Sequence, residues 1–534
     1  MFAAKRISYQ QTGAFTRIIT DYLSGSDQLK SFYSHPPNTR GIEAAIEQRK
    51  NFPSNRDVLV KVLKEQYQDI ETSQKVRSNI DSLLSQDSFT ITTAHQPNLF
   101  TGPLYLIYKI LHAIKLADSL GSNFPQYNFI PVYYLGSEDA DFAELNHTYV
   151  RGKKLEWQTG QGGAVGRMLT DRNLTSLLQE LKGQLGVEPF GNEIVSLMER
   201  CYSTGKSIQQ ATFEFLDEIF RDFGLVILIP DHDDLKRSMI PVFEDDIFHN
   251  KAVEIVERTS QRLGEHYNVQ AHSRPINLFY LKEHIRERIE KKGEGFQVLN
   301  TGISFSPGEL KKELLENPGR FSPNVIMRGL YQETILPNLA FIGGGGELAY
   351  WMQFKDLFEY YRVPFPVLIL RNSFLIIEEK WLNRIHKLGL SEEELFFPEN
   401  DIMNLIVERQ SKNLTSLNGN FEKAEDLFRS IQVQAETIDP SLSQHVAAIR
   451  TRSLKTLQEL EKKMLRAEKR KFSDQQGQVH KIKEVLFPNK GLQERVENIS
   501  GFYARWGKSF INELYQHSLA LEQEFVVLKE SAGS

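Results

Sequence analysis

The fold class is decided by the stretch Phe89-Thr90-Ile91-Thr92-Thr93-Ala94-His95-Gln96-Pro97-Asn98. Its first five residues are short and rich in β-branched side chains, which predicts a buried strand. A turn-like segment follows, then an apolar-rich helix from about 102 to 120 and a second strand at 129–135. Strand, helix and strand within about 45 residues form a βαβ unit, so the sequence predicts a parallel sheet.

Further strands extend this unit into a doubly wound α/β core. They are expected at 225–229, 325–327 and 367–370, with a helical segment from about 174 to 223. Residues up to about 85 are expected to be mainly helical. The expected organisation is a core over 1–375 with helical insertions at about 151–223 and 240–320, a helical region over 376–490, and a helical tail over 491–534 that packs on the core.

The helical region contains a stretch typical of a coiled coil. Residues 421–484 are long, charged and nearly free of glycine, and Leu457, Leu460, Met464 and Ala467 are spaced three and four apart. Pro440 is expected to separate two helices of a hairpin-like stalk. Residues 450–471 hold nine Lys or Arg against three Glu. Because aromatic residues do not interleave with them, we interpret these charges as a solvated helix surface rather than a nucleic-acid face.

The composition narrows the class of protein. A hydrophobic fraction of 40% and a charged fraction of 25% suit a folded chain. The net charge of −5 gives no general reason to expect nucleic acid or a membrane as a partner. No apolar run is long enough to cross a bilayer, and Met1–Tyr9 lacks the apolar core of an export signal. With Cys201 as the single cysteine, we expect a cytoplasmic protein in which that thiol only fills space.

Polar side chains follow three of the expected strands. Ligands bind at the carboxyl ends of the strands of an open parallel sheet. One such cluster is explained by turn chemistry alone, but three at equivalent ends indicate a site. The clusters are His95, Gln96 and Asn98; Ser137, Glu138, Asp139 and Asp141; and Asp231, His232, Asp233 and Asp234.

Two other features suit the recognition of anions. The glycine run 343–346 precedes an expected helix, and backbone N–H groups at such a helix start can approach an anionic ligand. Arg328 and Arg371 lie near expected strand ends, where guanidinium groups suit carboxylates or phosphates. No set of metal ligands is expected, although His232 with Asp231 and Asp233 offers a neighbourhood for Mg²⁺. A Gly-x-Ser-x-Gly nucleophile motif is missing from the sequence.

Six blocks of the sequence resemble the cysteine-adding enzyme family of bacillithiol biosynthesis. They are residues 93–105 (followed by Ile107, Tyr108 and Lys109), 131–142, 330–338, 343–351, 371–374 and 491–498. They run in family order from about 89 to 503, so the resemblance covers most of the chain. The chain departs from the family pattern at Ala94, His95, Ala140 and Gly345. No histidine at position 140 can therefore be essential here.

The resemblance implies a fold, a reaction and partners. The fold is a Rossmann-like core related to class I aminoacyl-tRNA synthetases and nucleotidylyltransferases, with helical connecting insertions and a coiled coil that forms a homodimer. The reaction joins the carboxyl group of cysteine to the amine of glucosaminyl-malate and gives bacillithiol. Because a carboxyl group must be activated, ATP or ADP is the expected nucleotide.

The resemblance and the strand-end clusters together give a hypothesis for the site. Two rival functions stay open: another ATP-dependent amide ligase or nucleotidylyltransferase on the same fold, and a non-catalytic coiled-coil scaffold. The glycines Gly343, Gly344, Gly345 and Gly346 are predicted to bind the nucleotide. The predicted catalytic residues are Asp139, Glu138, Asp141 and His95, and the predicted substrate-binding residues are Gln96, Asn98, Tyr108, Arg328, Tyr331, Gln332, Asn338, Glu347, Tyr350, Arg371, Asn372 and Ser373.

Overall fold

The computed structural model describes residues 2–411 and 416–531, and these form two compact units. One unit comprises residues 2–375 and 491–528, and the other comprises the described residues of 376–490 together with 529–531. The C-terminal segment 491–528 is therefore part of the same unit as the N-terminal half of the chain. Among the described residues, none of the helices has the length and apolar character that a bilayer-spanning segment needs.

A five-stranded parallel sheet forms the centre of the first unit, in the order β13-β12-β2-β3-β6. The chain runs outward from β2 through β3 to β6 and then returns to the other side of β2 as β12 and β13. The strand order therefore reverses between β2 and β12, the place where such sheets bind ligands. The strands are β2 (Ser88–His95), β3 (Asn128–Leu135), β6 (Val226–Leu228), β12 (Asn338–Gly343) and β13 (Val367–Leu370).

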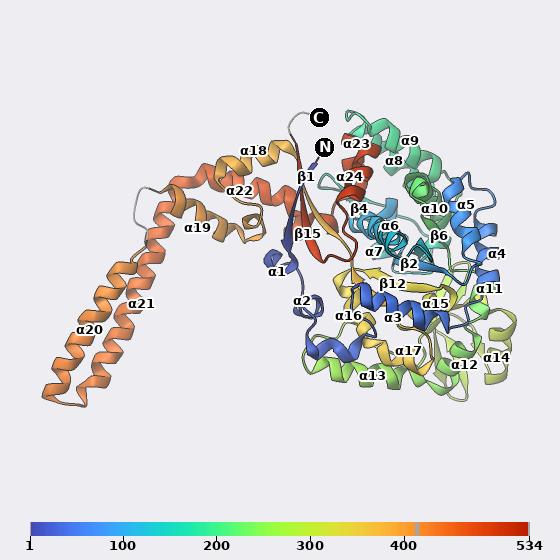
Figure 1. The fold of residues 1–534 in the computed structure, drawn as a ribbon, viewed down its shortest axis with the longest axis horizontal. Coiled ribbons are helices and arrows are strands. Elements are labelled where there is room, and N and C mark those ends of the chain that lie inside the picture. Colours follow the sequence, from blue (N-terminus) through green and yellow to red (C-terminus); the bar gives the residue numbers. More distant parts are fainter. Residues whose placement is uncertain (1, 412–415, 532–534) are drawn as a thin grey trace. The chain divides into compact units, whose positions relative to one another are not determined.

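Helices cover both faces of this sheet (Figure 1). Side chains alternate between the faces of a strand, so Phe89 and Ile91 face one side and Thr90 and Thr92 the other. Phe89 and Ile91 pack into a buried cluster with α3 (Thr39–Lys50) and α6 (Tyr105–Asn123). On the opposite face, the Thr90 and Thr92 hydroxyls donate to Asn338, which is joined to α15 (Val325–Ile335) through Glu333.

Most elements of the core were predicted correctly, but one segment was given the wrong type. Residues 325–327 were expected to be a strand and instead begin α15. Asn324 explains the difference, because its side chain accepts hydrogen bonds from the backbone N–H groups of Ile326 and Met327 and so caps the helix. The central strand β12 was not predicted, and β1 (Phe2–Ser8) occupies the start of a region that was expected to be mainly helical.

The second insertion is not purely helical as predicted. It holds α12 (Ile240–His249), α13 (Lys251–Gly264) and α14 (Pro307–Glu316), and an antiparallel sheet in the order β10-β9-β8-β7-β11. In β8 the charged residues lie on both faces, so the strand lacks the apolar alternation that would have revealed it. The strands are β7 (Leu278–Lys282), β8 (Ile285–Lys292), β9 (Gly295–Val298), β10 (Ser304–Phe305) and β11 (Phe321–Pro323).

The first insertion contains the predicted helices together with a short hairpin. That hairpin pairs β4 (His147–Val150) with β5 (Lys153–Glu156). The helices are α8 (Arg172–Leu185), α9 (Gly191–Cys201) and α10 (Ile208–Phe220). The segment after 491 is also mixed, since α23 (Ile499–Trp506) and α24 (Lys508–His517) lead into a strand, β15 (Glu524–Glu530), where a helical tail was expected. β15 lies between β1 and β14 (Ser373–Ile377) in a three-stranded sheet.

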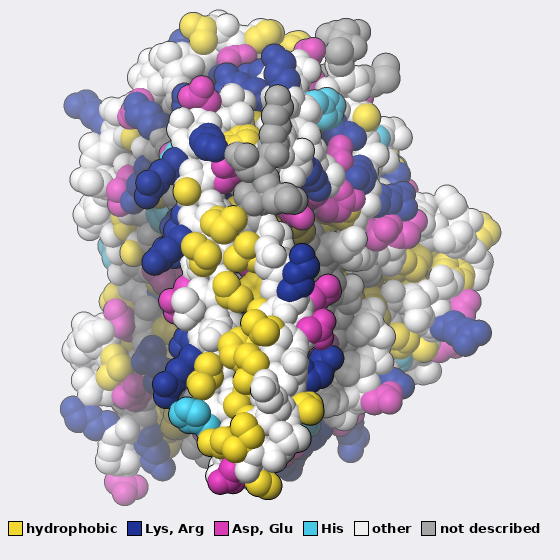
Figure 2. Space-filling view, turned by 90° about the vertical axis from the view of Figure 1, so that its left-hand side faces the viewer, with side chains coloured by type: hydrophobic (Ala, Val, Ile, Leu, Met, Phe, Trp, Pro, Cys, Tyr) yellow, Lys and Arg dark blue, Asp and Glu magenta, His cyan; other side chains and the backbone are white. Residues whose placement is uncertain are grey.

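The second unit is built from helices. They are α18 (Glu379–Leu388), α19 (Glu399–Gln410), α20 (Asn418–Ile438), α21 (Leu442–Lys469) and α22 (Ser473–Leu486). α20 and α21 form a hairpin that turns at Pro440, as predicted. Figure 2 looks onto this hairpin, where hydrophobic side chains form a band along its length. The large hydrophobic side chains that are exposed on α20 and α21, which we call the stalk band, are Leu427, Ile431, Val433, Ile438, Leu442, Ile449 and Leu460.

Candidate active site

A cavity of about 480 Å³ opens at the carboxyl ends of the parallel strands. It lies beside β2 and β12, where the strand order reverses, and so occupies the place that the topology favours. Carboxylates, guanidinium groups and one imidazole converge there, which suits a polar substrate. The lining residues are Ala94, His95, Gln96, Tyr105, Lys109, Tyr134, Gly136, Asp139, Glu144, Gln270, Val325, Arg328, Gly344, Gly345, Gly346, Glu347, Tyr350, Arg371 and Arg495.

His95 is the last residue of β2 and faces α6. Its Nε2 atom is 3.1 Å from the Tyr105 hydroxyl, and the two rings meet edge to face. Burial, followed by the positive charges of Lys109 and Arg371, holds the pKa of His95 well below its usual range. The imidazole is therefore neutral near pH 7 and can take part in hydrogen bonds without carrying charge.

Asp139 is held in place from two other elements. The Gln96 amide donates to Asp139 Oδ2 over 2.9 Å, and Arg328 of α15 donates to the same oxygen over 3.2 Å. Burial alone would raise the pKa of Asp139, but Arg328, Arg286 and the hydrogen bond from Gln96 lower it far below the usual range. Asp139 is thus a fixed carboxylate that stays ionised throughout the physiological pH range.

The glycine run forms another part of the wall, at the start of α16 (Gly345–Gln353). Glu347 accepts a hydrogen bond from the Gly344 N–H over 2.7 Å and pairs with the buried Lys109, which also donates to the Ala94 carbonyl. Gly344, Gly345 and Gly346 line the cavity, whereas Gly343 does not. A Cβ atom at Gly343 would lie 2.7 Å from the Phe341 ring, so that position requires glycine for packing.

Arg371 follows β13 and is fixed by the C-terminal segment. Its guanidinium is 2.7 Å from the buried Glu494 carboxylate and lies over the Tyr105 ring. Glu494 also accepts hydrogen bonds from the Ser373 hydroxyl and the Phe374 N–H. Arg371 therefore reaches the cavity in an orientation that is set by Glu494 and Tyr105, two residues that are distant from it in the sequence.

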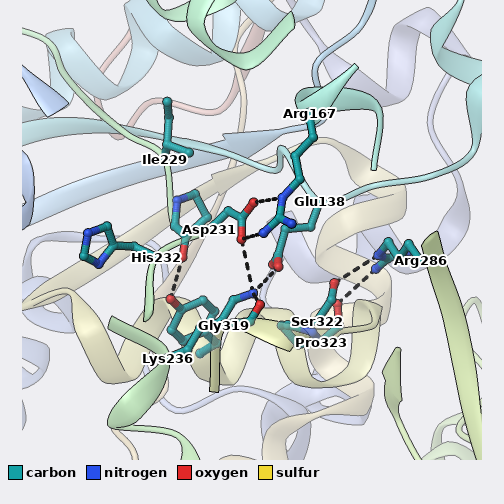
Figure 3. A network of polar contacts seen from close by, with 12 residues as sticks. Glu138, Arg167, Ile229, Asp231, His232, Lys236, Arg286, Gly319, Ser322 and Pro323 are labelled. Carbon is teal, nitrogen blue, oxygen red and sulfur yellow. Dashed lines mark hydrogen bonds and ion pairs between the residues drawn. The ribbon is translucent and has the colours of Figure 1, made fainter. Parts of the chain in front are cut away.

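Glu138 belongs to a buried network beside the cavity and not to its lining (Figure 3). Lys236 is fully buried and pairs with Glu138, while its ammonium group is 3.4 Å from Asp231 and donates to the Gly319 carbonyl over 3.0 Å. Arg167 makes a two-pronged contact to Asp231 at 2.6 and 2.8 Å. The oxygens of Asp231 are therefore already occupied, and this cluster holds the ends of β3 and β6 together.

Other predicted residues lie outside the cavity lining. Gln332 and Asn338 belong to a buried network with Glu333 and Arg49 at the amino end of β12, the edge opposite the cavity. Asp141 is exposed and caps α7 (Phe142–Leu145). The remaining predicted residues outside the lining are packed within the fold: Asn98, Tyr108, Tyr331, Asn372 and Ser373, each of which is buried.

The structure adds residues to the site that the sequence reasoning did not select. Tyr105 and Lys109 stand within or next to the first family-like block, so their position was the available signal. Glu144 lies on the short helix α7, and partial burial together with Asp141 and Asp139 raises its pKa. Tyr134 and Arg495 likewise stand within the family-like blocks 131–142 and 491–498, whereas Gln270 reaches the lining only through the tertiary fold.

Neither a reactive cysteine nor a protein metal cluster is found among the described residues. Cys201 lies buried in α9, and burial raises the pKa of its thiol to about 12, so the thiolate is scarce near neutral pH. Within the described part of the chain, no three His, Cys, Asp or Glu side chains come together in a way that could hold a metal ion.

Two family models together match nearly the whole chain. The N-terminal Rossmann-like domain of bacillithiol biosynthesis BshC matches residues 2–372, and the C-terminal coiled-coil domain of BshC matches residues 374–530. The chain belongs to the BshC family. This confirms the resemblance seen in the sequence blocks, and the parallel sheet and helical second unit confirm the predicted α/β fold class with a C-terminal coiled coil.

Relatives of the BshC family match along almost their full length. Proteins of Flavobacterium johnsoniae and Cytophaga hutchinsonii, both named "Putative cysteine ligase BshC", are 40% and 38% identical to this chain. The alignments cover 98% and 96% of this chain and 99% and 97% of theirs. A solved structure named as a putative arginyl-tRNA synthetase of Campylobacter jejuni covers 84% of the chain and 98% of its own, at 11% identity and a TM-score of 0.22.

Three of the four positions that were expected to depart from the family pattern lie at the cavity. Ala94, His95 and Gly345 all line the cavity, whereas Ala140 does not. His95 is therefore the imidazole that this chain presents at the end of β2, and its partner is Tyr105.

Proposed function

We propose that this chain is the ligase that joins cysteine to the amine of glucosaminyl-malate at the expense of ATP. The family and the names of its relatives support a cysteine ligase of bacillithiol biosynthesis. The observation that carries the proposal is that the fixed, ionised Asp139 and the glycines 344–346 line one cavity at the switch point of the sheet. Such a site offers one wall to an amine and the other to an activated carboxyl group.

The amine of the acceptor substrate is assigned to the Asp139 wall. During amide formation the amine nitrogen attacks the activated carboxyl carbon, gains positive charge and must then lose a proton. Asp139 has too low a pKa to be an effective proton acceptor, so its role is to orient the amine and stabilise that charge. Glu144 has a raised pKa and lines the same cavity, which makes it the better candidate for the proton acceptor.

The activated carboxyl group and the nucleotide are assigned to the glycine wall. Gly345 and Gly346 at the start of α16 present backbone to the cavity without side chains in the way. Lys109 and Arg371 supply positive charge for phosphate oxygens there. A nucleotide would supply the leaving group on the cysteine carboxyl, and Mg²⁺ carried by its phosphates fits a site with no protein metal cluster in the described residues.

The test is a reconstituted reaction with the purified full-length chain. Cysteine, glucosaminyl-malate and Mg·ATP are combined, and the thiol product is followed by mass spectrometry while AMP and ADP are quantified. The proposal predicts bacillithiol only when all three substrates are present, with one nucleotide consumed per amide. Product from a different amine or acid, with none from this pair, would replace the substrate assignment by another amide ligation. No turnover with any pair would favour a scaffold.

We also propose that the chain works as a homodimer in the cytoplasm. The stalk band exposes large apolar side chains along one hairpin, including Ile438 at 77% and Leu427 at 58% exposure. Exposed apolar side chains along a helical hairpin are typical of a coiled-coil contact with a second hairpin. The cytoplasm supplies both ATP and reduced cysteine, the reagents of the proposed reaction.

A further inference from the structure

A second pocket, of about 270 Å³, adjoins the cavity and is lined by arginines. It shares Asp139, Val325 and Arg328 with the cavity, so the two spaces meet at the Asp139–Arg328 pair. We call it the arginine pocket. Its lining is formed by His272, Arg274, Ile276, Asn277, Leu278, Phe279, Arg286, Arg288 and Asn324 in addition to the three shared residues.

Arg286 is the most firmly held of these arginines. Its guanidinium lies 4.0 Å from the centroid of the Phe279 ring, across the β7–β8 pair. Its Nε donates to the Ser322 hydroxyl over 3.0 Å and its Nη2 donates to the Pro323 carbonyl over 3.3 Å, both on β11 (Figure 3). Among the described residues it pairs with no carboxylate, and its Nη1 donates to no protein atom. Three strands thus fix a guanidinium that forms no salt bridge with a described residue, although the charges of Asp139 and Glu138 lie close enough to favour its protonated form.

The lining of the arginine pocket carries more positive than negative charge. Arg286 and Arg288 are two apart on β8 and therefore point to the same face, whereas Glu287 between them bonds to Asn300. Asp139 is the one carboxylate among the lining residues, and Gln96 and Arg328 already engage it. Burial and the charge of Arg328 lower the pKa of Arg286 to about 10. Placing like charges together in this way is unfavourable unless an anion joins them.

We propose that the arginine pocket binds a dianionic group of a substrate whose reacting end lies in the main cavity. Planar guanidinium groups match carboxylate and phosphate oxygens two at a time, and Arg286 is held ready for such a contact. Because the pocket opens beside Asp139, a substrate anchored there presents its other end to the amine wall. The identity of the anchored group rests on the proposed function: it is the malyl dicarboxylate of the acceptor substrate. A phosphate group is the other source of the same chemistry.

The test measures binding to the full-length protein by isothermal titration calorimetry. The titrants are L-malate, L-lactate, which lacks the second carboxylate, and pyrophosphate. The variants are Arg286→Gln and Arg288→Gln, with Arg320→Gln as the matched control. Arg320 belongs to the same insertion but pairs with Glu313, away from the pocket. Circular dichroism establishes that each variant is folded.

Malate is expected to bind the wild type and the Arg320→Gln control at least about tenfold more tightly than lactate, because two charges are matched instead of one. Arg286→Gln is expected to weaken malate binding at least about tenfold, and Arg288→Gln to weaken it by a smaller factor. Pyrophosphate binding that depends on Arg286, with malate binding that does not, would assign the pocket to phosphate. Unchanged binding of both anions in folded Arg286→Gln would overturn the proposal. Since the readout is binding, a failure of the cysteine-joining reaction leaves this result standing.

Discussion

Arg371 and Glu494 form a buried ion pair, with the guanidinium Nη2 2.7 Å from the carboxylate Oε1. The two residues are more than a hundred positions apart in the sequence, yet both side chains are almost fully enclosed, at 4% and 0% exposure. The pair fixes the segment after residue 491 against the end of β13, and it directs Arg371 towards the cavity. The C-terminal segment is therefore a structural part of the site.

Replacing Glu494 by Gln should destabilise the first unit by about 3 kcal/mol, because it leaves the buried Arg371 charge without a partner. Chemical unfolding followed by tryptophan fluorescence measures the change. The control is Glu180→Gln, which breaks a surface pair with Lys153 and should cost about 1 kcal/mol or less. Equal losses in the free energy of unfolding from the two substitutions would show that the buried pair stabilises the protein no more than a surface pair does.

Replacing Asp139 by Asn should lower turnover at least about 100-fold while the protein stays folded, because the amide carries no charge to stabilise the developing ammonium. Amide formation is measured under saturating substrates. Asp222→Asn is the control, since Asp222 pairs with Lys508 on the surface and lies outside the cavity lining, and this variant should lose only a few-fold at most. Retained turnover in Asp139→Asn would remove Asp139 from the mechanism.

The acid limb of the pH profile should report Glu144. Its pKa is raised above the ordinary value of a glutamate, first by partial burial and then by Asp141 and Asp139. A proton acceptor works only when it is deprotonated. Turnover of the wild type should therefore fall as the pH drops through that raised pKa. Glu144→Gln should be slower at every pH and should lack this limb. An acid limb that is identical in the variant would assign the proton to another group.

Asp246 should make the first unit less stable at higher pH. It lies on α12 and accepts hydrogen bonds from the backbone N–H and side-chain amide of Asn277, at 2.6 and 3.0 Å. Burial raises its pKa to about 7, above the value of about 3.9 in an unfolded chain.

The folded state thus holds the proton more tightly, so its stabilising contribution is complete below about pH 4 and is lost as the pH rises through about 7. Compared with Asp246→Asn, which does not titrate, the wild type should lose about 2 kcal/mol between pH 5 and pH 8. Urea unfolding of both proteins at several pH values measures this difference. A wild type that gains stability relative to the variant over this range would contradict the assignment.

Charges placed in the stalk band should separate the proposed dimer. The double variant with Ile431→Lys and Ile438→Lys puts two ammonium groups on the apolar surface of α20, which a second copy would have to desolvate. Sedimentation velocity should show a shift from dimer to monomer at micromolar concentration. Val187→Lys is the control, because Val187 is 87% exposed but lies in the first unit. A wild type that sediments as a monomer would refute the dimer.

Local sequence patterns were sufficient for the strands that are buried and rich in branched side chains. The expected strands at 89–93, 129–135 and 367–370 correspond to β2, β3 and β13. Local patterns gave the wrong prediction where a single capping residue or pairing with distant strands decides the type of secondary structure. The apolar residues 325–327 begin α15 because Asn324 caps that helix. The strand β12 contains few β-branched residues, and it is a strand because it pairs with β2 and β13 on either side.

The sequence by itself determined the βαβ core, the helical hairpin at Pro440, the family, and the clusters at the ends of β2 and β3. These depend on local periodicity and on motifs that are continuous in the chain. Only the tertiary structure decided which members of those clusters share a cavity. It placed Glu138 against Lys236, joined Arg371 to Glu494, and gathered the arginine pocket from separate strands. Burial and ion pairing arise between residues that are distant in sequence, so no local pattern encodes them.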